Sequence, residues 1–120
     1  MKKILIVDDD KAIVDLLSSS LAGDDRVIRW ALDGAGALNW LGKERFDLII
    51  CDLMMPKLHG FELLEWVKAN PECRQTRIMV LTAKSYRRDA EKARQSGAAV
   101  FLTKPFDVAD LQAKVDQLLS

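Results

Sequence analysis

The sequence predicts a three-layer α/β domain with a parallel five-stranded sheet, and three observations support this fold class. Short apolar runs alternate with segments of helical periodicity, the runs are rich in β-branched residues, and most of them are apolar throughout. The five expected strands are residues 4–7, 27–31, 48–51, 78–81 and 98–102. The length of 120 residues suits one domain spanning 1–120.

Each strand is followed by an expected helix. Apolar side chains at helical spacing predict helices near residues 13–21, 37–41, 63–67 and 108–119, and a less apolar fourth helix near 85–95. Candidate capping residues are Asp10, Asp33 and Asp107, and Asn70–Pro71 is expected to end the third helix. Arg29 interrupts the second strand, which is therefore the best candidate for a sheet edge.

Composition excludes several classes of protein. The 18 basic and 18 acidic residues cancel, which argues against broad nucleic-acid binding. No apolar run approaches the length of a membrane span, and no signal peptide is visible, so we expect a cytoplasmic protein that does not enter a membrane. Cys51, within an apolar run, and Cys73, in an expected polar loop, are interpreted as reduced thiols.

Polar residues gather where the expected strands end. Asp8, Asp9 and Asp10 follow the first strand and Asp52 follows the third. In a doubly wound, flavodoxin-like (βα)5 sandwich with strand order 2-1-3-4-5, the first and third strands are neighbours at the switch point, where ligands bind. Three carboxylates would then lie together, and their mutual repulsion predicts a divalent cation, Mg²⁺ or Mn²⁺.

The ends of the fourth and fifth strands add groups that can bind an anion. Lys104 supplies a positive charge on the other side of the site, Thr82 a hydroxyl, and Ala83 a backbone N–H. Asp52 is the natural nucleophile, because a carboxylate can form an acyl phosphate. The pattern predicts phosphoryl transfer through positioning and charge neutralisation.

The motifs together resemble the receiver domain of bacterial two-component response regulators. The resemblance covers essentially the whole chain and is carried by four motifs in order, namely residues 4–10, residues 52–60, Thr82–Ala83 and Lys104–Pro105–Phe106. It implies a Mg²⁺-dependent switch that is phosphorylated by a sensor histidine kinase or a phosphotransfer protein. It also implies a downstream effector protein or an output domain of its own, a homodimer that forms on phosphorylation, and no independent turnover.

The resemblance also implies a role for each matching residue. Asp52 corresponds to the phosphoacceptor, and Asp9, Asp52 and the Met54 carbonyl to the metal ligands, with Asp8 beside them. The remaining correspondences are the phosphate-binding Lys104, the switch pair Thr82 and Phe101, and a cis bond at Lys104–Pro105. The basic stretch 84–94 falls on the output surface formed by the fourth helix, fifth strand and fifth helix.

Other interpretations stay open for single residues and for the whole chain. Phe101 can be a plain core aromatic, and Thr82 can cap the fourth helix. A haloacid-dehalogenase-like phosphohydrolase also uses an aspartate nucleophile with Mg²⁺. That family carries a second aspartate two residues later, where this chain has Met54. A flavodoxin-like electron carrier is disfavoured because three carboxylates would repel a flavin phosphate.

Overall fold

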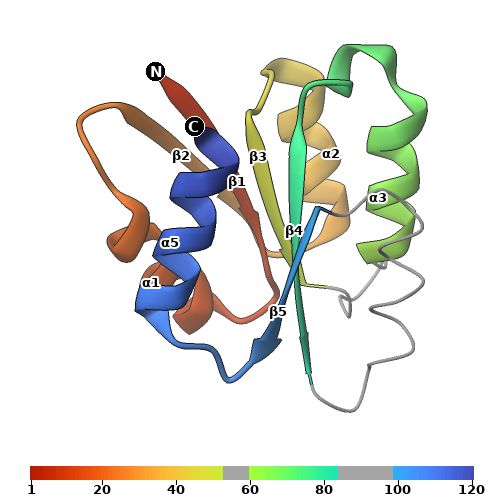
Figure 1. Ribbon diagram of the computed structural model, residues 1–120. Helices are drawn as coiled ribbons and strands as arrows, with labels where there is room; N and C mark the ends of the chain where they lie inside the picture. The colour runs from red at the N-terminus through yellow and green to blue at the C-terminus, as the bar shows by residue number, and fades with distance from the viewer. Residues whose placement is uncertain (53–59, 84–98) are drawn as a thin grey trace.

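The computed structural model describes residues 1–52, 60–83 and 99–120 and confirms the predicted α/β class (Figure 1). The elements in chain order are β1 Lys2–Val7, α1 Lys11–Leu21, β2 Arg26–Ala31, α2 Gly34–Lys43, β3 Leu48–Asp52, α3 Gly60–Ala69, the 3-10 helix η1 Pro71–Cys73, β4 Arg77–Ala83, β5 Val100–Lys104 and α5 Val108–Leu119. All strand pairs are parallel, and the strand order is β2-β1-β3-β4-β5. This is the flavodoxin-like order that the sequence predicted.

The described helices cover both faces of the sheet. Figure 1 shows α1 and α5 on one side of the strands and α2 and α3 on the other. In β1, Ile4 and Ile6 pack under α1 and α5, whereas Leu5 and Val7 pack under α2 and α3. Both faces of the strand are buried, which explains why it is apolar throughout. Each such side chain contributes about 1.5–3 kcal/mol by burial.

Helix termini follow the predicted capping residues. The side chains of Asp10, Asp33 and Asp107 each accept a hydrogen bond from a backbone N–H in the first turn of α1, α2 and α5, at 2.8–3.0 Å. Asn70 follows the last residue of α3, and its side chain caps η1. Local sequence therefore set these boundaries, because an aspartate or asparagine satisfies N–H groups that the helix itself cannot.

Two local expectations were wrong. The fifth strand runs from Val100 to Lys104 instead of 98–102, because its backbone pairs with β4 as far as Ala83↔Lys104, and pairing rather than apolar character defines its end. Cys73 is 4% exposed within η1 instead of lying in a polar loop, because the turn after Asn70 directs it into the α2–α3 layer. Both cysteines are free thiols, as expected.

Some predictions fall outside the described residues. These are the helix at 85–95, the basic stretch 84–94 and Met54. Within the described residues, no helix has both the length and the apolar character needed to cross a membrane.

Candidate functional site

Three carboxylates meet at the carboxyl ends of β1 and β3, as predicted. Asp8 directly follows β1, and Asp52 is the last residue of β3. The two strands are neighbours with Val7 paired to Cys51, so the next residues lie side by side. One carboxylate oxygen from each of Asp8, Asp9 and Asp52 lies within 4.8 Å of the others. Because β1 and β3 are neighbours in the sheet, acids that are far apart in the sequence form one cluster.

Lys104 contacts two members of this cluster directly. It ends β5, and its Nζ donates to Asp8 Oδ2 at 2.8 Å and to Asp52 Oδ2 at 3.1 Å. Because β4 lies between β3 and β5, only a long side chain can reach across to both acids. The sequence placed Lys104 at the site, but the ion pair with Asp8 required the three-dimensional structure.

Burial gives this cluster its electrostatic character. Asp8 is fully buried, and burial raises the pKa of its carboxyl above the usual value, although hydrogen bonds from Lys104 and from the Asp10 amide oppose that shift. Burial alone would lower the pKa of Lys104, but its hydrogen bond to Asp8 and the charges of Asp8 and Asp52 raise it instead. Lys104 is therefore held as a cation, while ionisation of Asp8 is disfavoured.

The donor set fits a divalent cation that prefers oxygen ligands. Asp9 is exposed and Asp52 is 8% exposed, so the cluster is open to solvent on the side of Asp9. One ammonium group cannot neutralise three carboxylates, and hard cations such as Mg²⁺ bind carboxylate oxygens while keeping several waters. Asp8, Asp9 and Asp52 are the described residues that could hold such an ion.

The structure describes the backbone of every remaining predicted site residue except Met54, but the side-chain burial of only some of them. The backbone of Thr82 and Ala83 forms the end of β4 and pairs with Thr103 and Lys104 of β5. The backbone of these two residues therefore lies beside that of the lysine, as expected. Phe101 is half-buried and packs against the α2–α3 layer, which agrees with a core role. The Lys104–Pro105 peptide bond is cis.

Sequence reasoning missed how Asp8 is oriented. Asp8 Oδ1 accepts the backbone N–H of Asp10 at 2.9 Å, which leaves Oδ2 for Lys104. An aspartate side chain bonded to the N–H two residues later is a local turn motif. The run of three aspartates after a strand was the signal that could have predicted it.

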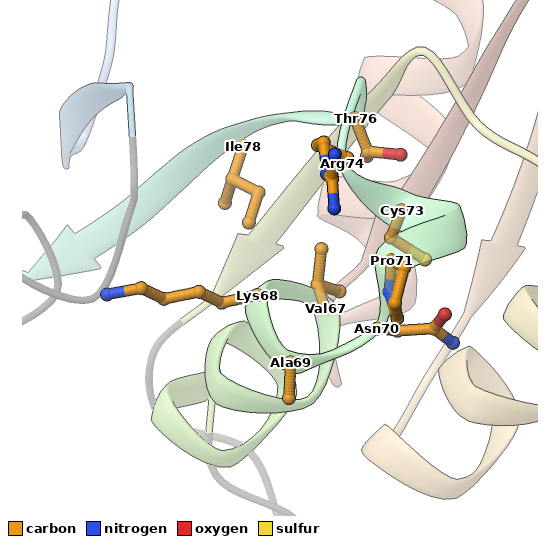
Figure 2. A pocket seen from close by; sticks show the side chains of 9 residues that line it. All are labelled: Val67, Lys68, Ala69, Asn70, Pro71, Cys73, Arg74, Thr76 and Ile78. Atoms are coloured by element: carbon orange, nitrogen blue, oxygen red, sulfur yellow. The ribbon is translucent and has the colours of Figure 1, made fainter.

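A hollow lies at the opposite end of the sheet from the acidic cluster, between α3, η1 and the start of β4 (Figure 2). It measures about 370 Å³ and is lined by side chains that include Val67, Pro71, Cys73 and Ile78. None of its described lining residues carries a carboxylate, and burial raises the pKa of the Cys73 thiol, which disfavours the reactive thiolate. The acidic cluster is therefore the stronger candidate for chemistry.

Three carboxylates and a lysine at the switch point of a flavodoxin-like sheet could together bind a cation and an anionic group such as phosphate. Residues 4–116 match the family model of the response regulator receiver domain, so the chain belongs to that family and is a receiver of two-component signal transduction. Members of the family generally are not turnover enzymes, and the match favours this family over the phosphohydrolase alternative.

Curated relatives and solved structures agree with this assignment. The chain is 37% identical over 99% of its length to the "DNA-binding dual master transcriptional regulator RpaA" of Synechocystis sp., of which it covers 49%. It is 37% identical over 97% of its length to the response regulator PleD of Caulobacter vibrioides, of which it covers 26%. The chemotaxis response regulator CheY4 of Vibrio cholerae superposes with a TM-score of 0.90 at 33% identity, with 99% of each chain covered. The chain thus spans half or less of these two curated relatives but the whole of CheY4.

Proposed function

We propose that this receiver accepts a phosphoryl group on Asp52 from the phosphohistidine of a sensor kinase or a phosphotransfer protein. The observation that carries the proposal is the contact of Lys104 with both Asp8 and Asp52 inside the acidic cluster. In this proposal Asp52 is the nucleophile, Lys104 is the cation fixed beside it, and the three carboxylates, which lie within 4.8 Å of one another, are available to a metal ion. Phosphoryl transfer needs these groups and little other chemistry.

The transfer forms one bond and breaks one. A carboxylate oxygen of Asp52 attacks phosphorus, the phosphorus–nitrogen bond of phosphohistidine breaks, and its electron pair stays on the imidazole nitrogen. Lys104 Nζ, 3.1 Å from Asp52 Oδ2, lies close enough to donate to an oxygen of a phosphoryl group on that carboxylate. We assign the remaining oxygens to the Thr82 hydroxyl and the Ala83 N–H.

We assign Mg²⁺ to Asp9, Asp52 and the Met54 carbonyl, with Asp8 as a further ligand or a water-mediated one. The bound ion supplies charge neutralisation for the incoming phosphoryl group, and Mn²⁺ can substitute for it. The three carboxylates that lie within 4.8 Å of one another, of which Lys104 contacts Asp8 and Asp52, support this assignment.

A partner then recognises the phosphorylated receiver. We propose that Thr82 and Phe101 rearrange on phosphorylation and so change the affinity of the surface around β5 and α5. This partner is an effector protein in the cytoplasm, an attached output domain or a second receiver that forms a homodimer. The printed name of RpaA describes it as DNA-binding, and we assign no DNA contact to the receiver itself.

Intact mass after incubation with acetyl phosphate and Mg²⁺ tests the proposal. We expect one added phosphoryl group in the wild type and in Asp10→Asn, a matched change of a neighbouring acid that keeps the helix cap. Asp52→Asn should add none, and EDTA should abolish the addition to the wild type. Undiminished labelling of Asp52→Asn would show that another residue is the acceptor.

A further inference from the structure

The outer edge of β2 carries a short row of backbone groups that no described residue uses. Figure 1 shows β2 at the margin of the sheet, and among the described strands it pairs with β1 alone. The C=O of Asp25 accepts a hydrogen bond from the start of β1, and the C=O of Ala31 accepts one from the residue after β1. Backbone groups alternate in direction along a strand, so the residues that face away from the sheet are Arg26, Ile28 and Trp30.

The backbone groups at both ends of this row already have hydrogen-bond partners. The Arg26 N–H donates to Gly23 O at 3.2 Å, in the turn before the strand. The Trp30 C=O accepts from the Trp40 indole Nε1 at 3.0 Å. Four outward groups remain between these two bonds without a partner in the described part of the chain, namely Arg26 C=O, Ile28 N–H, Ile28 C=O and Trp30 N–H.

These four groups match a parallel strand better than an antiparallel one. In a parallel pair, one residue bonds the two residues that flank its partner. A segment of three residues whose middle residue lies beside Ile28 would therefore bond all four groups. It would not need the Arg26 N–H or the Trp30 C=O, which already have partners. An antiparallel segment would also direct groups at the Arg26 N–H and the Trp30 C=O, which are occupied.

We call the four unpartnered backbone groups and the side chains beside them the β2 slot. The side chains of this slot favour an acidic residue beside Arg29. The Arg29 guanidinium lies 5.3 Å from the Trp40 ring and pairs with Glu44 at 3.1 Å. Lys3 shares the same Glu44 carboxylate at 3.6 Å. Lys43 lies 6.0 Å from the Trp40 ring and forms no ion pair with a described residue. One carboxylate thus serves several cations, and positive charge is in excess.

The other face of the slot is apolar and partly open. Ile28 packs only partly against the α1–α5 layer, and Trp30 is 43% exposed with Lys11 over its ring at 4.6 Å. A side chain beside Ile28 would therefore bury apolar surface that is now in contact with water.

We propose that the β2 edge binds an extended segment of a partner protein by parallel strand addition, with an apolar residue beside Ile28 and an acidic residue beside Arg29. The free backbone row gives the affinity and the charge at Arg29 gives the preference. Because only three residues pair, a short peptide should bind with a Kd on the order of 1 mM. This surface is separate from the acidic cluster and does not require phosphorylation.

Titration of the labelled protein with a capped valine–valine–glutamate peptide, followed by amide NMR, tests the proposal. We expect saturable shifts at the Ile28 and Trp30 amides. A lysine in place of the glutamate should weaken binding about fivefold, and Arg29→Gln should remove that preference. Binding centred on other elements, or no saturable shift, would overturn the proposal.

N-methylated peptides test the strand direction without changing the protein. In the parallel arrangement the glutamate N–H bonds Ile28 C=O, whereas the middle valine N–H faces away. Methylation of the glutamate nitrogen should therefore abolish binding, and methylation of the middle nitrogen should leave it unchanged. The reverse result would contradict parallel addition. Ile28→Pro, compared with Ile28→Val, removes one slot N–H at a position where an edge strand tolerates proline.

Discussion

The strand β3 has a carboxylate at each end, and the two are used in opposite ways. At its amino end, Asp47 Oδ2 accepts the Lys3 N–H at 2.8 Å, while the Asp47 N–H donates to Lys3 O at 2.8 Å. Asp47 O also accepts the Arg77 N–H at 3.0 Å, so this residue joins β1, β3 and β4. Its polar groups stabilise the sheet.

At the carboxyl end of β3, Asp52 lies close to two other carboxylates. It shares Lys104 with Asp8, and Asp9 lies within the same 4.8 Å cluster. This end carries charge that the fold does not neutralise, and a ligand can therefore gain by neutralising it. The two carboxylates thus differ in the donors that face them: Asp47 accepts a backbone N–H of its own, whereas Asp52 shares one lysine with Asp8.

The largest expected change in stability comes from removing the structural carboxylate. Asp47→Ala leaves the Lys3 N–H without its acceptor and should lower the free energy of unfolding by about 2 kcal/mol. Asp47→Asn retains an acceptor oxygen and should cost less than half as much. Urea unfolding measures both, and an unchanged midpoint for the alanine variant would remove the contrast between the two ends.

Metal should stabilise only through the carboxyl end. With Mg²⁺ at ten times its Kd, the wild type should gain about 1.4 kcal/mol, because the ion binds the folded state alone. Asp47→Asn should gain the same amount, whereas Asp9→Asn, which lacks one carboxylate of the cluster, should gain less at the same concentration. Thermal unfolding with and without EDTA provides the measurement, and equal gains in all variants would place the ion elsewhere.

Without metal, removing charge from the cluster should raise stability. Burial raises the pKa of Asp8, so its contribution favours folding at low pH and is lost as pH rises through the folded pKa. Asp8→Asn should therefore be more stable than the wild type at neutral pH. That gain should disappear below the usual aspartate pKa of 3.8. A gain independent of pH would show that packing, not charge, is responsible.

The smallest effect should come from Glu44, which follows α2 near the amino end of the sheet. The hydrogen bond from Arg29 lowers the pKa of Glu44, with burial opposing and the charges of Arg29 and Lys3 assisting. The contribution of Glu44 is therefore present above its unfolded pKa and lost as pH falls through the folded one. The difference between wild type and Glu44→Gln should shrink on acidification and in high salt. At neutral pH the wild type should be the more stable of this pair, whereas for Asp8→Asn the variant should be the more stable. Denaturation at several pH values measures it.

Local sequence was sufficient for the number and order of the strands, for the caps and for the acids, but not for every strand end. Asp8 and Asp52 were predicted as site residues because each directly follows or ends an apolar strand, where an acid has no place in the core. The end of β5 was misplaced by two residues, because hydrogen bonding to β4 extends that strand past its apolar run. The burial of Cys73 was missed for a similar reason, since its neighbours in sequence are polar and its neighbours in space are not.

The sequence by itself determined which residues stand at strand ends and that parallel strands would carry them. Apolar runs, caps and motif order are local or periodic properties, and they survive without knowledge of contacts. Tertiary structure alone decided that Lys104 bridges Asp8 and Asp52, that Asp47 is structural, and that Trp40 closes one end of the β2 edge. Each of these joins residues 10 or more positions apart, and only the packed chain fixes which donor faces which acceptor.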